Sequence, residues 1–377
     1  MYVKECSLRN FRSYEQVTVA FPAGVSALIG SNGQGKTNLV EAIGYLATLG
    51  SHRVATDAPL IKQGQQEAAI KIVAAHGDRE IELEIELRQG KPNTAKFNGS
   101  PLKRPRDLLG YLNTVIFAPE DLALVKGDPS DRRHFLDQTL IALTPRLAGT
   151  KADLDRVLKQ RNALLKTAQH AARRSTADVM RTLDAWDAQF ANLSAQLVIE
   201  RINLTRELLP FAQELYEQVS DDRGPFNMTY ENSLANAPDS DDPTIWEAAY
   251  LDALNERRND EIDRGITLVG PHRDELQIDV RNLPVKGYAS HGESWSAALT
   301  LRLASFELLR RDRSGGDPIL ILDDVFAELD SKRRKRLVEL TTTAEQTLVT
   351  AAVAEDVPPE LDGARFDVAN GEVRRVS

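Results

Sequence analysis

The sequence contains a single cysteine, Cys6, among 377 residues. One cysteine excludes an internal disulfide and any zinc site built from several cysteines, and a small apolar residue buried in a strand is favoured over a reactive thiol. No apolar run approaches the ~20 residues that a membrane-spanning helix needs. Residues 1–7 also lack the apolar segment of a secretory signal. We therefore expect a soluble cytoplasmic protein that contacts no membrane, with two domains at this length.

An excess of basic residues is also missing, because 47 Lys+Arg stand against 56 Asp+Glu and the formal net charge is −9. This balance argues against a uniformly basic nucleic-acid binder, but the charge is uneven. Residues 146–181 carry nine basic and three acidic residues, a net of +6, whereas residues 182–264 carry six and eighteen, a net of −12. A basic stretch beside an acidic one can bind a polyanion locally. Charge alone nevertheless favours the alternative, two solvated helical faces of opposite sign.

The first 120 residues are predicted to be rich in strands, with one helix. Residues 25–29 form a short continuous apolar run, typical of a strand buried on both faces, and residues 38–49 have helical spacing. Residues 70–75 and 81–87 predict a hairpin, since apolar residues alternate with Glu in its second strand. Further strands are predicted over 113–117 and 319–322.

From about residue 131 to residue 217 the pattern is helical. Leucines recur at spacings of three and four over 154–165 and 193–208, which predicts two long amphipathic helices. Residues 221–243 have the composition of a loop. The remaining predicted elements are strands over 266–269 and 276–280 and a helix over 299–309.

Gly30-Ser-Asn-Gly-Gln-Gly-Lys36-Thr37 matches the phosphate-binding P-loop pattern, with the expected strand before it and helix after it. The glycines allow successive N–H groups to point at phosphate oxygens, and the helix N-terminus adds a favourable dipole. Lys36 would reach the β- and γ-phosphates, and the Thr37 hydroxyl would ligate Mg²⁺. The predicted nucleotide-binding residues are Gly30, Ser31, Asn32, Gly33, Gln34, Gly35, Lys36, Thr37 and Asn38.

A P-loop site also needs a carboxylate at the end of another strand, near the metal. Four apolar residues, 319–322, are followed by Asp323 and Asp324, at what would be the carboxyl edge of a parallel sheet. Asp323 is the predicted Mg²⁺ ligand beside Thr37. Asp324 would orient or deprotonate the attacking water.

The segment Ser290-His-Gly-Glu-Ser294 precedes the helix predicted over 299–309. Ser290 and Gly292 fit a turn at a helix start, whose N–H groups could receive an anion. By itself a plain N-cap is the favoured interpretation, but the position just upstream of Asp323 favours a second nucleotide contact. We predict that Lys36, Ser290, Asp323 and Asp324 carry the catalysis, with Gly292 binding nucleotide.

The order of P-loop, Ser-x-Gly-Glu turn, acidic strand end and Ala327-Glu-Leu-Asp330 resembles the ABC-type ATPases. Leu8-Arg-Asn-Phe-Arg-Ser-Tyr14 resembles the opening of their SMC-like branch. Three further segments are similar to the RecF family of bacterial recombinational repair, namely Phe117-Ala-Pro-Glu-Asp-Leu122, Asp131-Arg-Arg-His-Phe-Leu-Asp137 and Gly270-Pro-His-Arg-Asp-Glu-Leu276. The match spans essentially the whole chain in order.

The resemblance implies an α/β fold with two lobes. An ABC-type ATPase head would comprise residues 1–120 and 265–377, with a mixed sheet around the P-loop and additional antiparallel strands. An α-helical arm would be inserted at residues 121–264. ATP would be held between the two heads of an ATP-dependent homodimer, with Ser290 touching the γ-phosphate in trans and Asp330 at the seam.

The resemblance also implies DNA with a single-strand/double-strand junction as a partner, and joint action with RecR and RecO in loading RecA. Three departures from the ABC pattern predict slow hydrolysis. Asp324 stands where Glu is usual, no switch histidine occurs over 347–352, and no glutamine occurs over 117–122. The alternatives are a transporter ATPase subunit, disfavoured because Ser290 lies 254 residues after Lys36, and a repair adaptor that uses ATP only as structural glue.

Candidate DNA contacts are the clustered Lys and Arg residues, because phosphate binding needs cations that follow a backbone. No base-reading motif is visible, so we expect recognition of shape and backbone. Pairing with acids of the fold is the rival role for the Arg-Arg pair at 132–133. The candidates are Lys103, Arg104, Arg106, Arg132, Arg133, Lys151, Arg156, Lys159 and Arg161.

Overall fold

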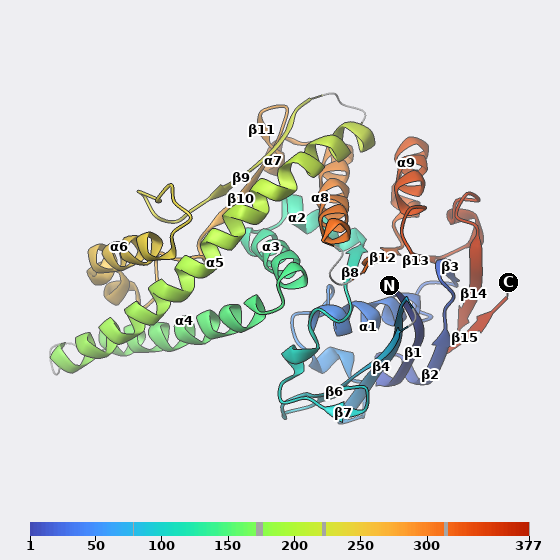
Figure 1. Ribbon diagram of the computed structural model, residues 1–377, viewed down its shortest axis with the longest axis horizontal. Helices are drawn as coiled ribbons and strands as arrows, with labels where there is room; N and C mark the ends of the chain where they lie inside the picture. Colours follow the sequence, from blue (N-terminus) through green and yellow to red (C-terminus); the bar gives the residue numbers. More distant parts are fainter. Residues whose placement is uncertain (78, 171–175, 221–223, 313–315, 377) are drawn as a thin grey trace. The chain divides into compact units, whose positions relative to one another are not determined.

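The computed structural model describes residues 1–77, 79–170, 176–220, 224–312 and 316–376 (Figure 1). Its internal contacts divide the chain into two units. Unit 1 contains Met1–Lys126, Pro210–Pro225 and Tyr288–Ser377, and unit 2 contains Gly127–Leu209 and Phe226–Gly287. The division expected from the resemblance lay at 120 and 264 instead. In the part of the chain that the structure describes, no helix is long and apolar enough to cross a membrane.

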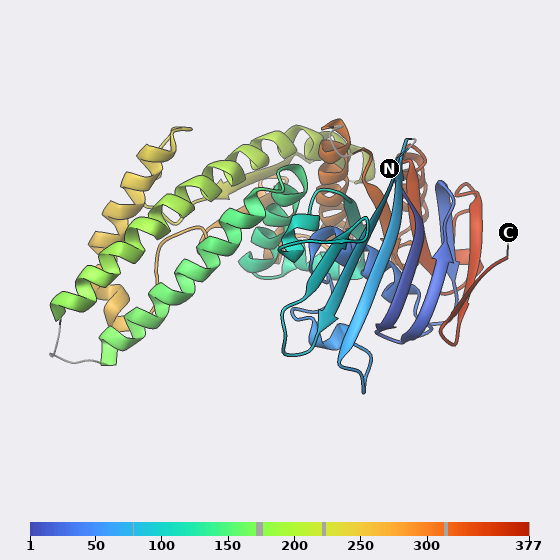
Figure 2. The ribbon, with the colours of Figure 1, turned by 60° about the horizontal axis from the view of Figure 1, so that its bottom comes forward.

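The first sheet of unit 1 is antiparallel, with the strand order β2-β1-β4-β5-β6-β7 (Figure 2). The predicted hairpin is confirmed: Leu83, Ile85 and Leu87 of its second strand are buried, and the alternating glutamates lie on the other face. The strands are β1 (Tyr2–Phe11), β2 (Tyr14–Ala20), β4 (Glu67–His76), β5 (Arg79–Arg88), β6 (Thr94–Phe97) and β7 (Ser100–Pro101).

The second sheet of unit 1 has the order β15-β14-β3-β13-β12-β8 and is parallel except for its edge strand β15. The predicted apolar strands are confirmed, and every residue of β12 is buried. The ends of β3 and β12 meet at one edge of the sheet, because both strands pair in parallel with β13. The strands are β3 (Gly24–Ile29), β8 (Thr114–Phe117), β12 (Ile319–Asp323), β13 (Gln346–Ala351), β14 (Gly363–Ala369) and β15 (Glu372–Arg375).

Helix α1 (Lys36–Thr48) contacts strands of both sheets, and its buried face shares their hydrophobic core. Gly44 lets this helix approach β8 closely, because a Cβ there would lie 2.3 Å from Cδ1 of Ile116 and that side chain would have to move. Helix α8 (His291–Arg311) packs on β8 and α2 (Leu122–Lys126). The other elements of unit 1 are α9 (Ser331–Thr341) and the 3-10 turns η1 (Ala58–Leu60), η2 (Pro105–Leu108), η3 (Pro119–Asp121), η4 (Phe326–Glu328) and η5 (Ala354–Asp356).

Unit 2 is mainly helical, and the two predicted long helices are confirmed as α4 and α5. Its small sheet has the order β11-β10-β9. The helices are α3 (Pro129–Leu143), α4 (Leu147–His170), α5 (Thr176–Val219, whose last residues belong to unit 1), α6 (Pro243–Arg264) and α7 (Val285–Tyr288, which ends in unit 1). The strands are β9 (Phe226–Glu231), β10 (Glu275–Val280) and β11 (Leu283–Pro284).

Two local predictions in this region are wrong. Residues 226–231, expected to be loop, form β9, because Phe226 and Met228 alternate into the core beside β10. Residues 266–269, expected to be a strand, are not one: the backbone N–H groups of Thr267 and Leu268 donate to side chains of Asn162 and Glu261. Residues 171–175 of the basic stretch at 146–181 lie outside the described residues.

Candidate nucleotide-binding site

The P-loop lies between β3 and α1, as the sequence predicts. Gly33 and Gly35 have φ values of 82° and 113°, which only glycine adopts readily. Lys36 begins α1 and is 3% exposed. Its ammonium group donates to the carbonyl oxygens of Gly30 at 2.7 Å and Ser31 at 3.4 Å, so it lies across the mouth of the loop.

Two strands pack against the P-loop, β14 at Gly30 and β2 at Gly35. A Cβ on Gly30 would lie 2.2 Å from the carbonyl oxygen of Val368 in β14, and a Cβ on Gly35 would lie 2.7 Å from the Tyr14 hydroxyl. Tyr14 is buried and donates to the carbonyl oxygen of Gly35 at 3.1 Å. Its phenol therefore supports the loop and is not free to stack on a base.

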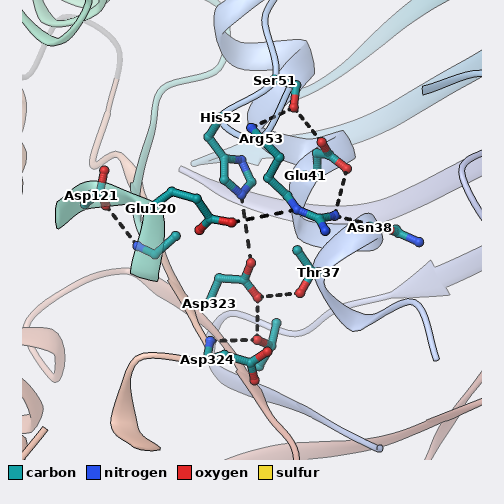
Figure 3. Close-up of polar contacts among 12 residues, drawn as sticks. Thr37, Asn38, Glu41, Ser51, His52, Arg53, Glu120, Asp121, Asp323 and Asp324 are labelled. Atoms are coloured by element: carbon teal, nitrogen blue, oxygen red, sulfur yellow. Dashed lines mark hydrogen bonds and ion pairs between the residues drawn. The ribbon is translucent and has the colours of Figure 1, made fainter. Parts of the chain in front are cut away.

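Asp323 lies at the P-loop edge of β12, beside Thr37 (Figure 3). Its Oδ1 accepts hydrogen bonds from the Thr37 hydroxyl at 3.0 Å and the Thr350 hydroxyl at 2.6 Å. Burial raises the pKa of Asp323, but the adjacent His52 imidazole and these hydroxyls lower it by more, so the net pKa is below its ordinary value. This carboxylate is therefore kept ionised.

The pKa of Asp324, unlike that of Asp323, is raised above its ordinary value. Its φ of 53° is unusual for a residue with a side chain, and its N–H donates to the Thr350 hydroxyl at 3.0 Å. Partial burial raises the pKa of Asp324 despite the opposing effect of Lys36, and the charge of Asp323 raises it further. Asp324 lines a pocket of about 170 Å³, with Asn32 of the P-loop on its wall.

Thr37 and Asp323 fit the magnesium ion that a P-loop site implies. Mg²⁺ prefers oxygen ligands and usually keeps several waters and phosphate oxygens. The two side chains supply oxygens 3.0 Å apart at the N-terminus of α1. Over the described ranges, no group of three or more His, Cys, Asp or Glu residues could hold a metal ion.

The turn after α1 brings a histidine to this edge that the sequence pattern does not reveal. Nε2 of His52 lies 3.9 Å from Oδ2 of Asp323, which is too long for a hydrogen bond (Figure 3). The same turn carries Arg53, whose guanidinium donates to the Asn38 amide oxygen at 3.2 Å. His52 and Asp323 are 271 residues apart in sequence, so only the fold shows that they meet.

Ser290 caps the N-terminus of α8 in a capping box with Glu293. Its Oγ accepts from the Glu293 N–H at 3.2 Å, and its own N–H donates to the Glu293 carboxylate at 2.7 Å. A Cβ on Gly292 would lie 3.1 Å from the guanidinium of Arg333, which also pairs with Asp330. Among the described residues, no hydrogen bond joins Ser290 to the P-loop of the same chain.

The segment over 117–122 bears acids where the ABC pattern has glutamine. The Asp121 carboxylate accepts from the Ala118 N–H at 2.9 Å and from Arg302 of α8 at 2.6 and 3.0 Å. Glu120 lies 4.0 Å from Arg53. The segment 117–122 therefore has two neighbours: Glu120 lies near Arg53 in the turn that carries His52, and Asp121 is bound by Arg302 of α8, the helix that Ser290 caps.

Among the DNA candidates of unit 2, Arg161 is corrected. It is fully buried, and it pairs with Asp187 and Glu261 at 2.6 Å each. Arg132 is also corrected, because its 6% exposed side chain forms a bidentate pair with Glu275 at 2.6 and 2.7 Å. A cation that is buried and already paired cannot reach a DNA phosphate.

The other unit 2 candidates are more accessible. Arg156 and Lys159 are exposed on α4, one helical turn apart. Arg133 is partly buried and donates to the carbonyl oxygen of Asp274 at 2.7 Å. It lines a pocket of about 170 Å³ together with Lys151, which is paired with Asp155 at 2.6 Å.

In unit 1 the candidates lie at the start of η2. Lys103 and Arg104 are exposed, and Arg104 pairs with Asp107 at 3.0 Å. Arg106 is partly exposed. The structure therefore leaves these three residues accessible but does not join them to the P-loop edge.

Known proteins match this chain over most or all of its length. The model of the RecF/RecN/SMC N terminal domain matches residues 2–358. The DNA replication and repair protein RecF of Streptomyces avermitilis is 52% identical over 377 residues, with full coverage of both chains. This chain belongs to the RecF family. The RecF of Frankia alni is 53% identical over 380 residues, again with full coverage of both chains.

Solved structures extend the RecF likeness to the fold. A recombination mediator protein RecF with ATP, of the RecFOR pathway, is similar with a TM-score of 0.89 and 27% identity, covering 100% of this chain and 98% of that one. An Smc head domain from Pyrococcus yayanosii, with a TM-score of 0.56 and 15% identity, covers 100% and 97% and supports the fold alone. The predicted α/β fold and RecF resemblance are confirmed.

Proposed function

We propose that this RecF-family chain is an ATP-dependent DNA-binding protein of replication and recombinational repair. ATP drives formation of a homodimer that acts as a clamp at gapped or single-strand/double-strand junction DNA. With RecR and RecO, the clamp assists the loading of RecA. Slow hydrolysis of ATP acts as the timer that releases it.

The observation that carries the proposal is the hydrogen bond between Thr37 and Asp323. They lie 286 residues apart in sequence, yet the hydroxyl of one donates to the carboxylate of the other at the mouth of the P-loop. A glycine-rich turn without a ligand has no need of a buried carboxylate whose pKa is lowered. A nucleotide with its metal does need that arrangement.

The roles of the chain's residues follow from the geometry. Lys36 exchanges its loop carbonyl partners for β- and γ-phosphate oxygens, and the P-loop N–H groups cradle the phosphates. Thr37 and Asp323 hold Mg²⁺, which when bound neutralises charge on the phosphates. Asp324 orients the attacking water and accepts its proton, because a carboxyl with a raised pKa is a better base than an ordinary one.

Ser290 acts in trans in this proposal. It is exposed, and its hydrogen bonds within the chain are confined to its own helix start. An exposed helix N-terminus suits the γ-phosphate of a second copy. Asp330 pairs with Arg333, and the Arg333 guanidinium lies beside Gly292. The residues of the proposed dimer seam at the starts of α8 and α9 are therefore neighbours.

Dimerisation is tested by light scattering with and without Mg·ATP and gapped DNA. The wild-type chain should become dimeric only with Mg·ATP. Lys36→Ala should lose nucleotide binding and the dimer, because hydrogen bonds to charged groups contribute about 1.5–3 kcal/mol each. Ser290→Ala should still bind nucleotide but remain a monomer. A wild-type chain that stays monomeric in saturating Mg·ATP with DNA contradicts the clamp.

Ser290→Asp is the matched control for the capping role. Asp is as good an N-cap as Ser, so α8 keeps its cap, but a second negative charge is placed against the γ-phosphate. If Ser290→Asp dimerises like the wild type, the trans contact is wrong. If it melts like the wild type and stays monomeric with Mg·ATP, loss of the cap is not the reason.

A non-hydrolysing adaptor is a second candidate, favoured by Asp324. Its side chain is one methylene shorter than the usual Glu, and its backbone holds a left-handed φ. A single-turnover assay with excess enzyme and radiolabelled ATP separates the two. ADP formed over minutes, and lost in Asp324→Asn, supports the timer, whereas no ADP over hours supports the adaptor.

A further inference from the structure

His52 has a polar atom that the structure leaves without a hydrogen bond. Nε2 of His52 is buried and has no hydrogen-bond partner among the described residues. A buried polar atom of this kind costs free energy unless it has a use. Oδ2 of Asp323 lies 3.9 Å from it (Figure 3).

The Asp323 carboxylate is held on one side only. Both hydroxyls, from Thr37 and Thr350, donate to Oδ1. Over the described ranges, no hydrogen bond reaches Oδ2. The position of Oδ2, and with it the plane of the carboxylate, is therefore not set by either hydroxyl.

The position of His52 is set by a network that does not include the nucleotide site. Glu41 of α1 is fully buried and accepts from the Arg12 guanidinium at 2.6 and 2.8 Å and from the Ser51 hydroxyl at 2.5 Å. The Ser51 hydroxyl in turn accepts from the N–H groups of Arg53 and Val54 at 2.9 and 3.1 Å. The turn that carries His52 is therefore fixed before any ligand binds.

Resting on the proposed function, we propose that His52 is a positioning residue for the metal-bound Asp323. With its proton on Nε2, the imidazole donates to Oδ2 after a shift of less than 1 Å and fixes the plane of the carboxylate through the oxygen that the two hydroxyls do not contact. It touches neither the metal nor the phosphates. Partners of this kind typically change metal affinity by about 10–100-fold.

The test measures how much Mg²⁺ tightens nucleotide binding. The dissociation constant of a fluorescent ATP analogue is determined in EDTA and in Mg²⁺ for each variant, and the ratio of the two values is the metal enhancement. His52→Ala should lower this ratio by about tenfold or more. Its affinity in EDTA should stay within about twofold of the wild type. Thr37→Ala, which removes a metal ligand, gives the benchmark for a lost enhancement.

Two conservative variants distinguish positioning from packing. The amide nitrogen of Gln lies the same number of bonds from Cβ as Nε2 of His, whereas that of Asn corresponds to Nδ1 and falls short. His52→Gln should therefore restore most of the enhancement, and His52→Asn should not. His76→Gln, which changes an exposed histidine of β4, should match the wild type.

Each outcome has a definite meaning. An unchanged ratio in His52→Ala, or equal rescue by Gln and Asn, overturns the positioning role and leaves the proposed function intact. A wild-type chain that binds no nucleotide with or without Mg²⁺ overturns the proposed function itself. If His52→Ala melts far below the wild type, the Gln and Asn pair decides alone.

Discussion

Two arginines of α4 that look alike in the sequence have different surroundings in the structure. Arg161 is fully buried between Asp187 and Glu261, whereas the Arg156 side chain is 70% exposed and pairs with Asp153. Both belong to the same basic stretch. Burial, not sequence position, decides which of them stabilises the fold and which is free to meet a polyanion.

Replacing Arg161 should lower the unfolding free energy of unit 2. Arg161→Leu leaves the buried Glu261 without its cation and Asp187 with Arg258 alone, which costs about 3–5 kcal/mol of unfolding free energy. Arg156→Ala should change it by no more than about 0.5 kcal/mol. Urea denaturation followed by circular dichroism gives both values. A loss under 1 kcal/mol in Arg161→Leu would contradict a buried ion-pair cluster.

His272 makes the stability of unit 2 depend on pH. Burial lowers the pKa of His272 from 6.5 to about 4, although a contact with the Thr267 carbonyl oxygen opposes the shift. Between pH 6.5 and 4 the unfolded chain therefore binds more protons than the folded one. Stability falls as the pH falls through this window, by up to about 3 kcal/mol.

Removing this histidine should remove that part of the pH dependence. Urea midpoints of the wild type and of His272→Gln are compared at pH 7 and pH 5. The drop between the two pH values should be smaller in His272→Gln. Equal drops in the two proteins would mean that His272 is charged in the folded state at pH 5.

At the scale of elements, two adjacent arginines of α3 serve different ends. The Arg132 guanidinium clamps α3 to β10 through Glu275. Arg133 donates one hydrogen bond to a carbonyl oxygen of the same region and lines a pocket beside Lys151. Arg132→Ala should therefore lower unfolding free energy by about 2–3 kcal/mol, less than for a fully buried pair because Glu275 is 22% exposed.

Arg133→Ala is the matched variant on the next residue. It should change unfolding free energy by no more than about 1 kcal/mol but weaken binding of gapped DNA, measured by fluorescence anisotropy with the fold checked by melting. A loss of DNA affinity in Arg132→Ala at full stability, with none in Arg133→Ala, would reverse the assignment of the two residues.

Elements with strong local patterns could be predicted from sequence, and those stabilised by side chains could not. Strands β3, β5 and β12 and helix α1 combine a clear period with a clear start, so their prediction holds. The apolar run at 266–269 resembles a strand, but its N–H groups find partners in α4 and α6. No local pattern reports such partners.

The site divides in the same way. The P-loop and Asp323 could be predicted because each is a contiguous motif with a known mechanism. His52 could not, because it reaches Asp323 only through the turn that Glu41 fixes, and Glu41 is an ordinary helix residue in the sequence. Arg161 was misjudged because an arginine on a helix shows its charge in sequence but not its burial.

At the scale of the whole molecule, a net charge of −9 must be reconciled with the proposed DNA binding. The proposal is that local cations, not the total charge, set affinity. Log affinity falls linearly with log salt concentration, and the slope counts the phosphates that protein cations neutralise. Arg156 and Lys159, exposed one turn apart on α4, are the unit 2 cations proposed to contribute.

A pair of double variants separates location from total charge. Arg156→Ala/Lys159→Ala and Arg257→Ala/Arg264→Ala each remove two exposed cations, so both change the net charge from −9 to −11. The first, on α4, should reduce the salt slope for gapped DNA by roughly 1–2. The second, on α6, should leave the slope unchanged if binding is local. Equal reductions in both would mean that the total charge governs binding and that α4 is only a solvated helix face.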